Sequence, residues 1–473
     1  MATRSSASSR KRSASFDAAA WLSSLANFEQ RPTKADGQTP HFGLERIEAL
    51  CDKLGNPHQT VPAVHVAGTK GKGSTCAMTA AMLRACGHRT GLYTSPHLVD
   101  VRERIRVLEP TADAQALPQG EMIGQADFDA CIEKVAKAAK AAKVTPTYFD
   151  ALTAAAFVYF AEQELDIMVV EVGLGGRLDS TNVLTPLVSV ITPLSLDHTQ
   201  QLGPTLSHIA REKAGIIKPG VTAITCLQPD EATLGVLQDV AKERKTHLRV
   251  LGEDVEFTWR FEASRMLGRN NRIGFETDRL LFDHLAVPLL GEHQAVNCGL
   301  ALTAMDELAI RGVEGITSEA CAKGLDGLTF DGRLEVIRDE PTVIADAAHN
   351  AAGIDALFRA VGQHFTYDAS VVIFGCAADK DTDAMLDKLM AGADKVIFCP
   401  IDSPRSANPR ELQKVYHDAF GRMSQTAGSL QDALRLARGA LTDDDLLVIT
   451  GSFHLVGEAK RILARKAAAR DAA

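Results

Sequence analysis

The chain has 473 residues, of which 45% are hydrophobic and 23% charged, and its formal net charge is -9. That length exceeds what one hydrophobic core usually organises, so two domains are expected. The acidic balance argues against a nucleic-acid binder, and no apolar run approaches the roughly 20 residues that span a bilayer. The nine cysteines occur singly, which is typical of a reducing compartment, so we expect a cytoplasmic protein without nucleic-acid or membrane partners.

Residues 1–15 form a basic, Ser-rich stretch at the start of the chain. They have no apolar core, which excludes a secretory signal. Two interpretations stay open: a disordered tail, which the composition favours, and an organellar transit peptide.

From Val61 onwards, short β-branched runs alternate with Ala-rich helical stretches. The predicted strands are 61–66, 166–172, 187–192, 342–345, 370–374, 395–399 and 446–450, and predicted helices include 78–84, 151–164, 354–365 and 409–420. This alternation predicts an α/β fold with parallel sheets covered on both faces. A Gly-rich stretch at 324–332 suggests a boundary between a domain at 16–325 and a smaller one at 326–473.

The first strand leads directly into a glycine-rich loop at residues 67–75, and a helix follows. Gly68, Gly71 and Gly73 leave backbone N–H groups free to surround phosphate oxygens, and Lys72 supplies a positive charge at the start of the helix. The match to the usual phosphate loop is imperfect, because Gly73 stands where Ser or Thr should follow the Lys. The hydroxyls come later, at Ser74 and Thr75. The loop predicts a nucleoside triphosphate site.

The second strand ends in Glu171, followed by the glycine-rich segment 173–182. The order Gly-x-Gly-Gly-Arg differs from a dinucleotide fingerprint, which argues against hydride transfer. A carboxylate directly after an apolar strand lies at the carboxyl edge of a parallel sheet, where such sheets bind ligands. The third strand leads to His198, which alone would be read as a structural histidine. Its position level with Glu171 favours a ligand instead.

Two further segments are ordinary when taken alone. The Thr-Ser-Pro-His sequence at 94–97 reads as a turn, and 147–150 reads as a helix start with Thr147 or Asp150 as the N-cap.

The variant Gly-Thr-x-Gly-Lys-Gly-Ser at 68–74, together with the segment at 171–182, resembles the Mur ligase superfamily and specifically the folylpolyglutamate/dihydrofolate synthases. The resemblance covers roughly residues 42–458. It implies a phosphate-loop ATPase domain followed by a smaller Rossmann-like domain. The implied activity is ATP-dependent addition of L-glutamate to folate, and to dihydropteroate, through an acyl-phosphate.

The resemblance also implies the roles of individual residues. Ser95 would bind one Mg²⁺, Glu171 would bridge two, and His198 and a carbamylated Lys213 would bind the second. The nucleotide would be held by Gly71, Lys72, Gly73, Ser74, Asn297 (at adenine), Arg333, Asp346 and His349. The pterin substrate would lie near Thr147, Tyr148, Phe149, Asp150, Leu178, Asp179 and Ser180. Catalysis would fall to Lys72, Glu171, His198 and Lys213. Ala351 departs from the family pattern, which commonly has Pro there.

Two other functions are alternatives to this ligase activity. A Mur-type ligase acting on a cell-wall nucleotide precursor usually carries a UDP-binding domain before the loop, whereas only about 66 residues precede it here. A nucleotide-dependent switch without ligase activity would not need the two-metal set. We expect a monomer that acts on small molecules.

Overall fold

The structure is a computed structural model that describes residues 16–29, 43–111, 119–264 and 268–471. The predicted tail at 1–15 lies outside the described residues. Within the described part, no helix is both long enough and apolar enough to cross a membrane.

The larger sheet has eight strands, in the order β4-β3-β2-β5-β1-β6-β7-β8. The strands are β1 (Ala63–Ala67), β2 (Thr90–Tyr93), β3 (Ile105–Leu108), β4 (Glu121–Met122), β5 (Ile167–Glu171), β6 (Val188–Ile191), β7 (Ala223–Cys226) and β8 (Leu248–Leu251). Strands β2 to β8 pair in parallel along this order, and β3 and β4 add an antiparallel edge. The central position of β1 places the loop that follows it at the middle of the sheet.

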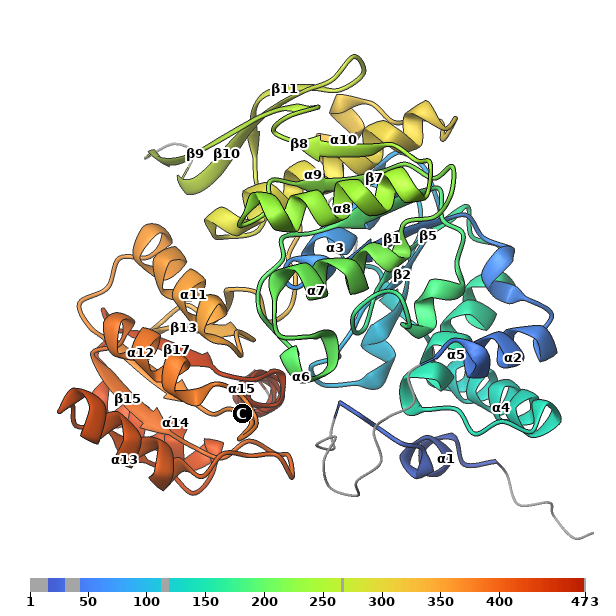
Figure 1. The fold of residues 1–473 in the computed structure, drawn as a ribbon. Coiled ribbons are helices and arrows are strands. Elements are labelled where there is room, and N and C mark those ends of the chain that lie inside the picture. Colours follow the sequence, from blue (N-terminus) through green and yellow to red (C-terminus); the bar gives the residue numbers. More distant parts are fainter. Residues whose placement is uncertain (1–15, 30–42, 112–118, 265–267, 472–473) are drawn as a thin grey trace, which may run out of the picture.

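Helices cover both faces of this sheet, as the sequence predicted (Figure 1). The α-helices of this part are α1 (Ala18–Ser24), α2 (Glu45–Lys53), α3 (Lys72–Ala85), α4 (Gln125–Ala142), α5 (Tyr148–Glu162), α6 (Thr199–Leu202), α7 (Leu206–Lys213), α8 (Glu231–Glu243), α9 (Glu292–Ile310) and α10 (Ser318–Leu325). Short 3-10 helices lie at Pro57–Gln59, Val101–Arg104, Ser180–Val183 and Ala214–Ile216. Val64 and Val66 pack with α3 and α9, whereas Ala63 packs with α5 on the opposite face. Both faces of β1 are therefore buried, and His65 is the one polar residue in the strand.

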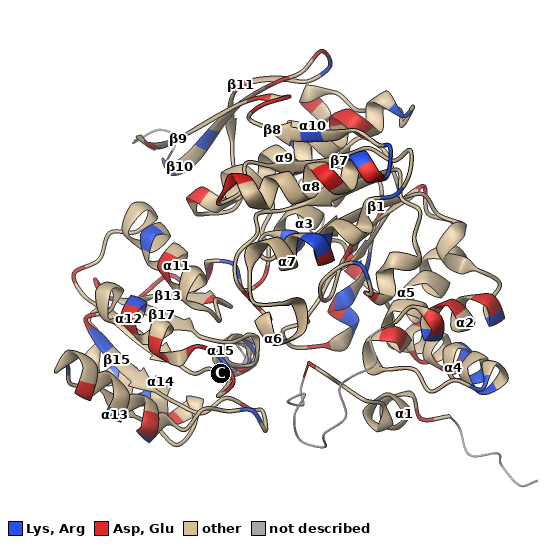
Figure 2. Ribbon diagram, viewed as in Figure 1, with Lys and Arg blue, Asp and Glu red and all other residues tan. Residues whose placement is uncertain are grey.

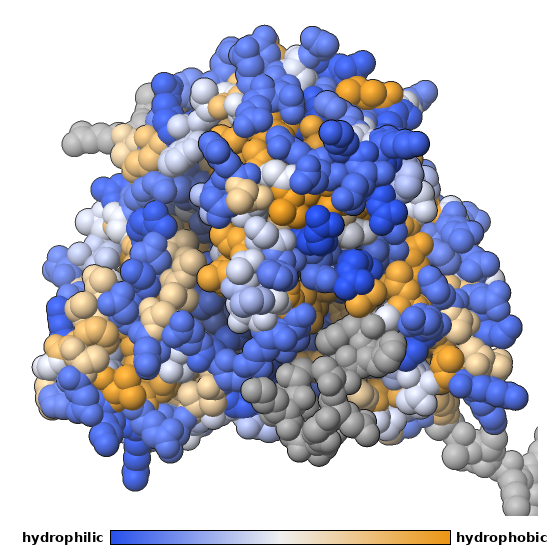
Figure 3. All heavy atoms as spheres, in the orientation of Figure 1, coloured by the Kyte–Doolittle hydropathy of each residue, from blue (hydrophilic) through white to orange (hydrophobic). Residues whose placement is uncertain are grey.

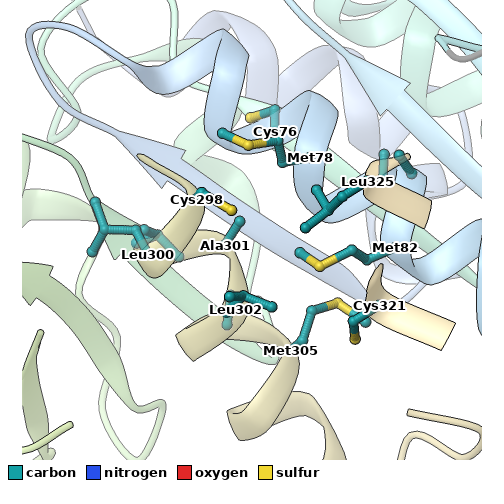
Figure 4. Close-up of a cluster of buried hydrophobic side chains, with 14 of the residues drawn as sticks. Cys76, Met78, Met82, Cys298, Leu300, Ala301, Leu302, Met305, Cys321 and Leu325 are labelled. Atoms are coloured by element: carbon teal, nitrogen blue, oxygen red, sulfur yellow. The ribbon is translucent and has the colours of Figure 1, made fainter. Parts of the chain in front are cut away.

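The helix that follows the glycine-rich loop is buried along nearly its whole length. Its inner side meets α9 and α10 in a sulfur-rich core made of Cys76, Met78, Met82, Cys298, Met305 and Cys321 (Figure 4). Unbranched Met side chains fill irregular gaps between helices. The loop is thus carried by an element fixed in the core.

Residues 256–286 form a separate antiparallel sheet that the sequence analysis did not predict. Its strands are β9 (Glu256–Ser264), β10 (Gly268–Glu276) and β11 (Leu281–Ala286), in the order β11-β10-β9. Ile273 and Phe275 alternate with polar residues and are buried. One face of this sheet therefore covers the core, and the other faces outwards.

The C-terminal sheet has six strands in the order β12-β13-β17-β14-β15-β16. The strands are β12 (Glu335–Arg338), β13 (Thr342–Asp346), β14 (Ser370–Phe374), β15 (Lys395–Phe398), β16 (Gln425–Thr426) and β17 (Leu446–Thr450), and the helices are α11 (Ala351–His364), α12 (Thr382–Gly392), α13 (Pro409–Phe420), α14 (Leu430–Ala440) and α15 (Phe453–Asp471). Only β12 is antiparallel to its neighbour. The predicted α/β class is confirmed in both sheets. The predicted boundary falls between α10 and β12, and the exact division stays a prediction.

Charges on the outer helices are mixed in sign (Figure 2). Helices α4 and α8, for example, each carry both acidic residues and lysines. The one broad hollow on the visible face lies between the C-terminal part and the rest of the molecule (Figure 3). A ligand bound in this hollow would contact both parts of the molecule.

Candidate active site

The glycine-rich loop after β1 is held in place by its neighbours. Gly71 precedes α3 with φ +86°, and a Cβ there would lie 2.1 Å from Oδ1 of Asn297 on α9. Gly68 has φ +149° and backs onto Thr192, whose hydroxyl donates to the carbonyl of Lys70 at 2.7 Å. Only glycine fits these two positions without displacing a neighbour. The structure thus brings Asn297, predicted to contact adenine, directly against the loop.

Glu171 lies at the carboxyl end of β5 and is buried. Its Oε2 accepts a hydrogen bond of 2.9 Å from the backbone N–H of Ser95. Burial raises the pKa of Glu171, and the Lys72 ammonium opposes this rise. The predicted ligands are therefore adjacent, with Ser95 on the loop after β2 and Glu171 at the end of the neighbouring strand β5.

Lys213 is buried at the end of α7, with its Nζ donating to the carbonyl of Gly68 at 2.7 Å. Burial and the nearby charge of Lys72 lower the pKa of Lys213 to about 7. A lysine with so low a pKa is partly uncharged near neutrality, which is the form that reacts with CO₂. The geometry places Lys213 against the phosphate loop, where the resemblance expects it.

His198 has φ +50° and begins the short helix α6. Its side chain is 44% exposed and lies 3.8 Å from Asp197. Among the described residues, no three His, Cys, Asp or Glu side chains gather closely enough to hold a metal ion. Two of the four predicted ligands, Ser95 and Lys213, are of other types, so the metal assignment stays a prediction.

The two segments predicted near the pterin meet through Asp150 and Ser180. The Ser180 hydroxyl donates to Asp150 at 2.6 Å, while Asp150 also caps α5 by accepting from the backbone N–H of Thr147 at 2.9 Å. Both N-cap candidates thus take part in one capping box. Phe149 packs on the backbone of Gly173, where a Cβ would come within 2.4 Å of the ring.

The other predicted substrate residues differ in whether their side chains are already bound to groups of the protein. Both carboxylate oxygens of Asp179 are hydrogen-bonded within its own loop. They accept from the N–H of Leu174 and from both the N–H and the hydroxyl of Thr181. Leu178 is half-buried, and Tyr148 lies beneath the Arg104 guanidinium at 5.9 Å from the ring centroid. Asp179 therefore shapes the loop, and Tyr148 presents an aromatic surface.

The C-terminal part contributes Arg333, Asp346 and His349. Arg333 stacks between Phe330 and Phe453, with its guanidinium carbon 5.7 and 5.1 Å from the two ring centroids. Asp346 accepts from the N–H groups of Leu334 and Ala348, at 2.9 and 2.8 Å. Burial raises the pKa of Asp346, and Arg333 opposes this rise.

One pocket joins the two parts of the molecule. Its lining includes Gly73, Ser95 and Glu171 from the N-terminal part and Arg333 and Phe453 from the C-terminal part. Of the predicted phosphate-loop, metal and nucleotide residues, Gly73, Ser95, Glu171 and Arg333 line this pocket, whereas the other predicted residues are not part of its lining.

Asp197 was not predicted to have a role, yet it connects the two parts. It accepts from Asn350 at 3.1 Å and from Lys380 at 3.3 Å, and His349 lies 3.9 Å away. Burial alone would raise the pKa of Asp197, but His198, Lys380 and His349 hold it well below its usual range. One feature of the sequence could have indicated this contact: the segments 196–199 and 379–381, which contain Asp197 and Lys380, each follow a predicted strand.

Models of two protein families match the chain. The Mur ligase middle domain matches residues 66–305, and the Mur ligase glutamate ligase domain matches residues 332–453. Together the two matches span the phosphate loop, the pocket and the C-terminal sheet.

Curated relatives resemble the chain over most of its length. The dihydrofolate synthase/folylpolyglutamate synthase of Bacillus subtilis is 31% identical over 94% of this chain and 98% of its own. The folylpolyglutamate synthase of Lacticaseibacillus casei is 35% identical over 88% of this chain and 94% of its own.

Solved structures show the same architecture. The Mycobacterium tuberculosis folylpolyglutamate synthase complexed with ADP and AMPPCP has a TM-score of 0.80 at 32% identity, covering 89% of this chain and 95% of that one. Escherichia coli FolC, in complex with DHPP and ADP, also has a TM-score of 0.80, at 28% identity and with 96% and 99% covered.

Proposed function

The chain belongs to the folylpolyglutamate/dihydrofolate synthases of the Mur ligase family, and from this premise we propose that it uses ATP to join L-glutamate to a folate-type carboxylate. Tetrahydrofolates and dihydropteroate are the proposed acceptors. The expected class of enzyme, an ADP-forming ligase, agrees with the relatives over both domains.

One observation carries the proposal for where the reaction occurs. The buried carboxylate of Glu171 lies under the influence of Lys72, and both the glycine-rich loop and Arg333 line the pocket at its side. Cationic groups that converge on a glycine-rich loop suit a triphosphate. Nucleotide binding through Gly71, Lys72, Gly73, Ser74, Asn297, Arg333, Asp346 and His349 follows as part of the proposal.

Two Mg²⁺ ions are proposed at Ser95, Glu171, His198 and Lys213. The Ser95 hydroxyl and the Glu171 carboxylate fit, because hard oxygen atoms are the ligands that Mg²⁺ prefers, and Lys213 would supply such an oxygen as a carbamate. The Ser95 N–H holds Glu171 in one orientation, as expected of a ligand that is positioned in advance. Bound there, the ions would neutralise triphosphate charge.

Carbamylation of Lys213 is proposed to make this residue an oxygen ligand. The ammonium first loses one proton, and the uncharged amine then adds to CO₂, forming an N–C bond and releasing a second proton, so the side chain changes overall from a cation to an anion. The lowered pKa of Lys213 supports this step. The carbamate nitrogen keeps one hydrogen and could still donate to Gly68.

The proposed reaction has two steps. The acceptor carboxylate attacks the γ-phosphorus, ADP leaves, and an acyl-phosphate forms while Lys72 stabilises the phosphate charge. The glutamate amine then attacks the activated carbonyl, phosphate leaves, and an amide remains. Contacts of Asp197 with Asn350 and Lys380 keep the C-terminal part over the pocket, which would limit hydrolysis of the acyl-phosphate by water.

Three coarser proposals accompany this mechanism. The boundary between the ATPase and glutamate-ligase domains is placed between residues 325 and 326. A monomer that acts on small molecules is also proposed, as the sequence suggested. Nine free thiols support a reducing compartment such as the cytoplasm.

A phosphate-release assay tests the function. ATP and L-glutamate are supplied with dihydropteroate, with tetrahydrofolate or with a UDP-muramoyl acceptor. We expect release with the first or second acceptor and none with the third. Release with only the UDP-muramoyl acceptor would contradict the proposal and favour a cell-wall ligase.

A further inference from the structure

A buried arginine beside the pocket is paired with a carboxylate from the N-terminal segment. The Arg104 side chain is fully buried, and its two terminal nitrogens donate to Oε1 and Oε2 of Glu29 at 2.9 and 2.6 Å. Its Nε donates to Nδ1 of His97 at 3.0 Å, and its guanidinium lies over Tyr148. This fork is the geometry in which arginine recognises any carboxylate.

The pair lies close to the proposed reaction centre. The carbonyl of Arg104 accepts from the N–H of Thr94 at 3.1 Å, and the next residue, Ser95, holds Glu171. The charge of Arg104 also reaches Glu171, where it contributes to lowering the pKa against the effect of burial. Arg104 therefore stands on the other side of the turn that positions Glu171.

The carboxylate also lies where the two parts of the molecule meet. Arg405, from the C-terminal part, donates to the backbone carbonyl of Glu29 at 2.6 Å and pairs with Asp379. His454, on α15, is close enough to contribute to lowering the pKa of Glu29. Arg405 lies within the region matched by the Mur ligase glutamate ligase domain, residues 332–453, and His454 directly follows that region.

An ordinary ion pair that anchors the N-terminal segment is the simplest interpretation. The two partners are nevertheless unequal: Arg104 is completely buried, whereas the Glu29 side chain is 36% exposed. A buried guanidinium needs an anion, because an unpaired buried charge is strongly destabilising. Arg104 lies at the end of the 3-10 helix Val101–Arg104, His97 on the loop after β2 and Tyr148 in α5, whereas the anion comes from the N-terminal segment.

We propose that Arg104 binds a carboxylate of a substrate, and that Glu29 takes the place of that carboxylate when the substrate is absent. The Oε1 and Oε2 atoms of Glu29 stand for the two substrate oxygens. This inference rests on the proposed function, which brings two carboxylate-bearing substrates to the pocket. The source is either L-glutamate or the folate carboxylate that is not activated.

Dihydropteroate separates these two sources. It has a single carboxylate, the one that is activated, so with this acceptor only L-glutamate can supply a second carboxylate to Arg104. If Arg104 binds the folate carboxylate instead, its effects appear with tetrahydrofolate and disappear with dihydropteroate.

Competition between Glu29 and the substrate sets the expected size of the effect. If Glu29 occupies Arg104 about nine-tenths of the time, the apparent affinity for the substrate is reduced about tenfold. Glu29→Gln keeps the shape and removes the charge. The KM for the affected substrate should fall about three- to tenfold, while the KM for ATP stays the same. An anchor alone predicts an unchanged or higher KM.

The kinetic test compares the natural chain with Glu29→Gln, Arg104→Lys and the double variant. Arg104→Lys keeps the charge but loses the fork, so the KM for the same substrate should rise about tenfold or more. In the double variant, loss of Glu29 should no longer lower the KM. Glu109→Gln is the matched control, because both oxygens of Glu109 accept from the Nε of Arg89, away from the pocket. Its KM values should equal those of the natural chain.

Equilibrium dialysis repeats the comparison without turnover, using labelled L-glutamate and labelled tetrahydrofolate in the presence of ADP. Tighter binding of one of them by Glu29→Gln, and weaker binding by Arg104→Lys, supports the inference even if no ligase reaction is observed. Unchanged or weaker binding of both by Glu29→Gln overturns it. That result would leave the phosphate-release assay, and with it the proposed function, unaffected.

Discussion

At the scale of single residues, the site is defined by buried charged side chains. Burial of such a side chain destabilises the fold unless an opposite charge or a hydrogen bond offsets it. Glu171 and Lys213 are both buried, and Lys72 influences the pKa of each. Burial pushes the carboxylate towards its protonated form and the lysine towards its neutral form. A bound triphosphate and its counter-ions would reverse this tendency for the carboxylate, so these residues are suited to a charged ligand.

We expect Lys72→Ala to lower turnover on the order of 10²- to 10³-fold, because one charge contact to the transferring phosphate is lost. Lys72 begins α3 and is only half-buried, so the fold should persist. Steady-state phosphate release measures the effect, and circular dichroism checks the fold. Lys134→Ala, which removes an exposed lysine paired with Glu162, serves as the control. Near-normal turnover in Lys72→Ala would contradict the assignment of residues 67–75 as a phosphate loop.

Lys213 should carry a carbamate that ¹³C NMR can detect after addition of labelled bicarbonate. Its pKa of about 7 means that the ammonium predominates below pH 7 and the reactive amine above it. The carbamate signal, and activity with it, should therefore increase from pH 6 to pH 8. Lys213→Ala should abolish both.

Lys218→Ala is the matched control for this experiment. Lys218 also has its pKa lowered by burial, and its Nζ also donates to a backbone carbonyl, that of Asn182 at 2.8 Å. Its replacement should leave the labelled signal in place. A signal that persists in Lys213→Ala would assign the carbamate to another lysine.

At the scale of elements, the apolar strands and their order along the chain could be predicted, and β14, β17 and α13 begin and end where expected. Strand β1 was predicted at 61–66 and lies at Ala63–Ala67, because flanking Val61 is buried without joining the sheet. The β9–β11 sheet was missed although β9 and β10 have nine residues each. In β9, Phe257, Trp259 and Phe261 alternate with Thr258 and Arg260, a pattern that is typical of a half-buried strand.

Contacts between distant elements could not be predicted at all. Glu29 and Arg104 are 75 residues apart, and Asp197 and Lys380 are 183 apart. No periodicity in either segment encodes these partners. The resemblance supplied the positions of Glu171, Ser95 and Lys213, and the structure brings all three beside the phosphate loop.

The loop after β5 depends on a histidine in β1. Thr181 donates its hydroxyl to Asp179 at 2.5 Å, so the Nε2 of His65 donates to Thr181, at 2.8 Å. Burial lowers the pKa of His65 from 6.5 to about 3. Between these values the unfolded chain binds a proton that the folded chain does not, so stability decreases as the pH falls through that range.

Between pH 7 and pH 5, His65 should contribute a loss of about 2 kcal/mol in the free energy of unfolding. His65→Gln keeps a donor for Thr181 but has no group that titrates in this range. Its free energy of unfolding should therefore fall by about 2 kcal/mol less than that of the natural chain between pH 7 and pH 5. Urea unfolding at the two pH values measures the difference. His88→Gln, at a surface histidine bonded to the carbonyl of Glu314, should behave like the natural chain. Equal acid sensitivity in His65→Gln would contradict the assignment.

At the scale of the whole molecule, the pocket exists only where the two parts meet. The N-terminal part supplies Glu171 and Ser95, and the C-terminal part supplies Arg333 and Phe453. Asp197 fixes their relation through two hydrogen bonds to the C-terminal part. Turnover should therefore respond to contacts that touch no substrate.

We expect Lys380→Ala to lower kcat on the order of tenfold, because a charge-assisted hydrogen bond across the junction contributes about 1–3 kcal/mol. The melting temperature should change little, since each part keeps its own core. Small-angle X-ray scattering should show a larger radius of gyration. Lys388→Ala, at an exposed lysine paired with Asp387, is the control. An unchanged kcat in Lys380→Ala would show that the junction does not depend on Asp197.

The sulfur-rich packing around α3 gives the molecule a built-in attachment point for a spectroscopic reporter. Eight of the nine cysteines are buried, and Cys86, at the far end of the helix that begins with Lys72, is half-buried. A hydrogen bond with Cys321 lowers the pKa of the Cys86 thiol, whereas burial raises that of Cys76 and Cys298. Since the thiolate is the reactive form, a maleimide dye should modify the native chain at Cys86 first. One fluorophore would then report on α3 during nucleotide binding without any engineered cysteine.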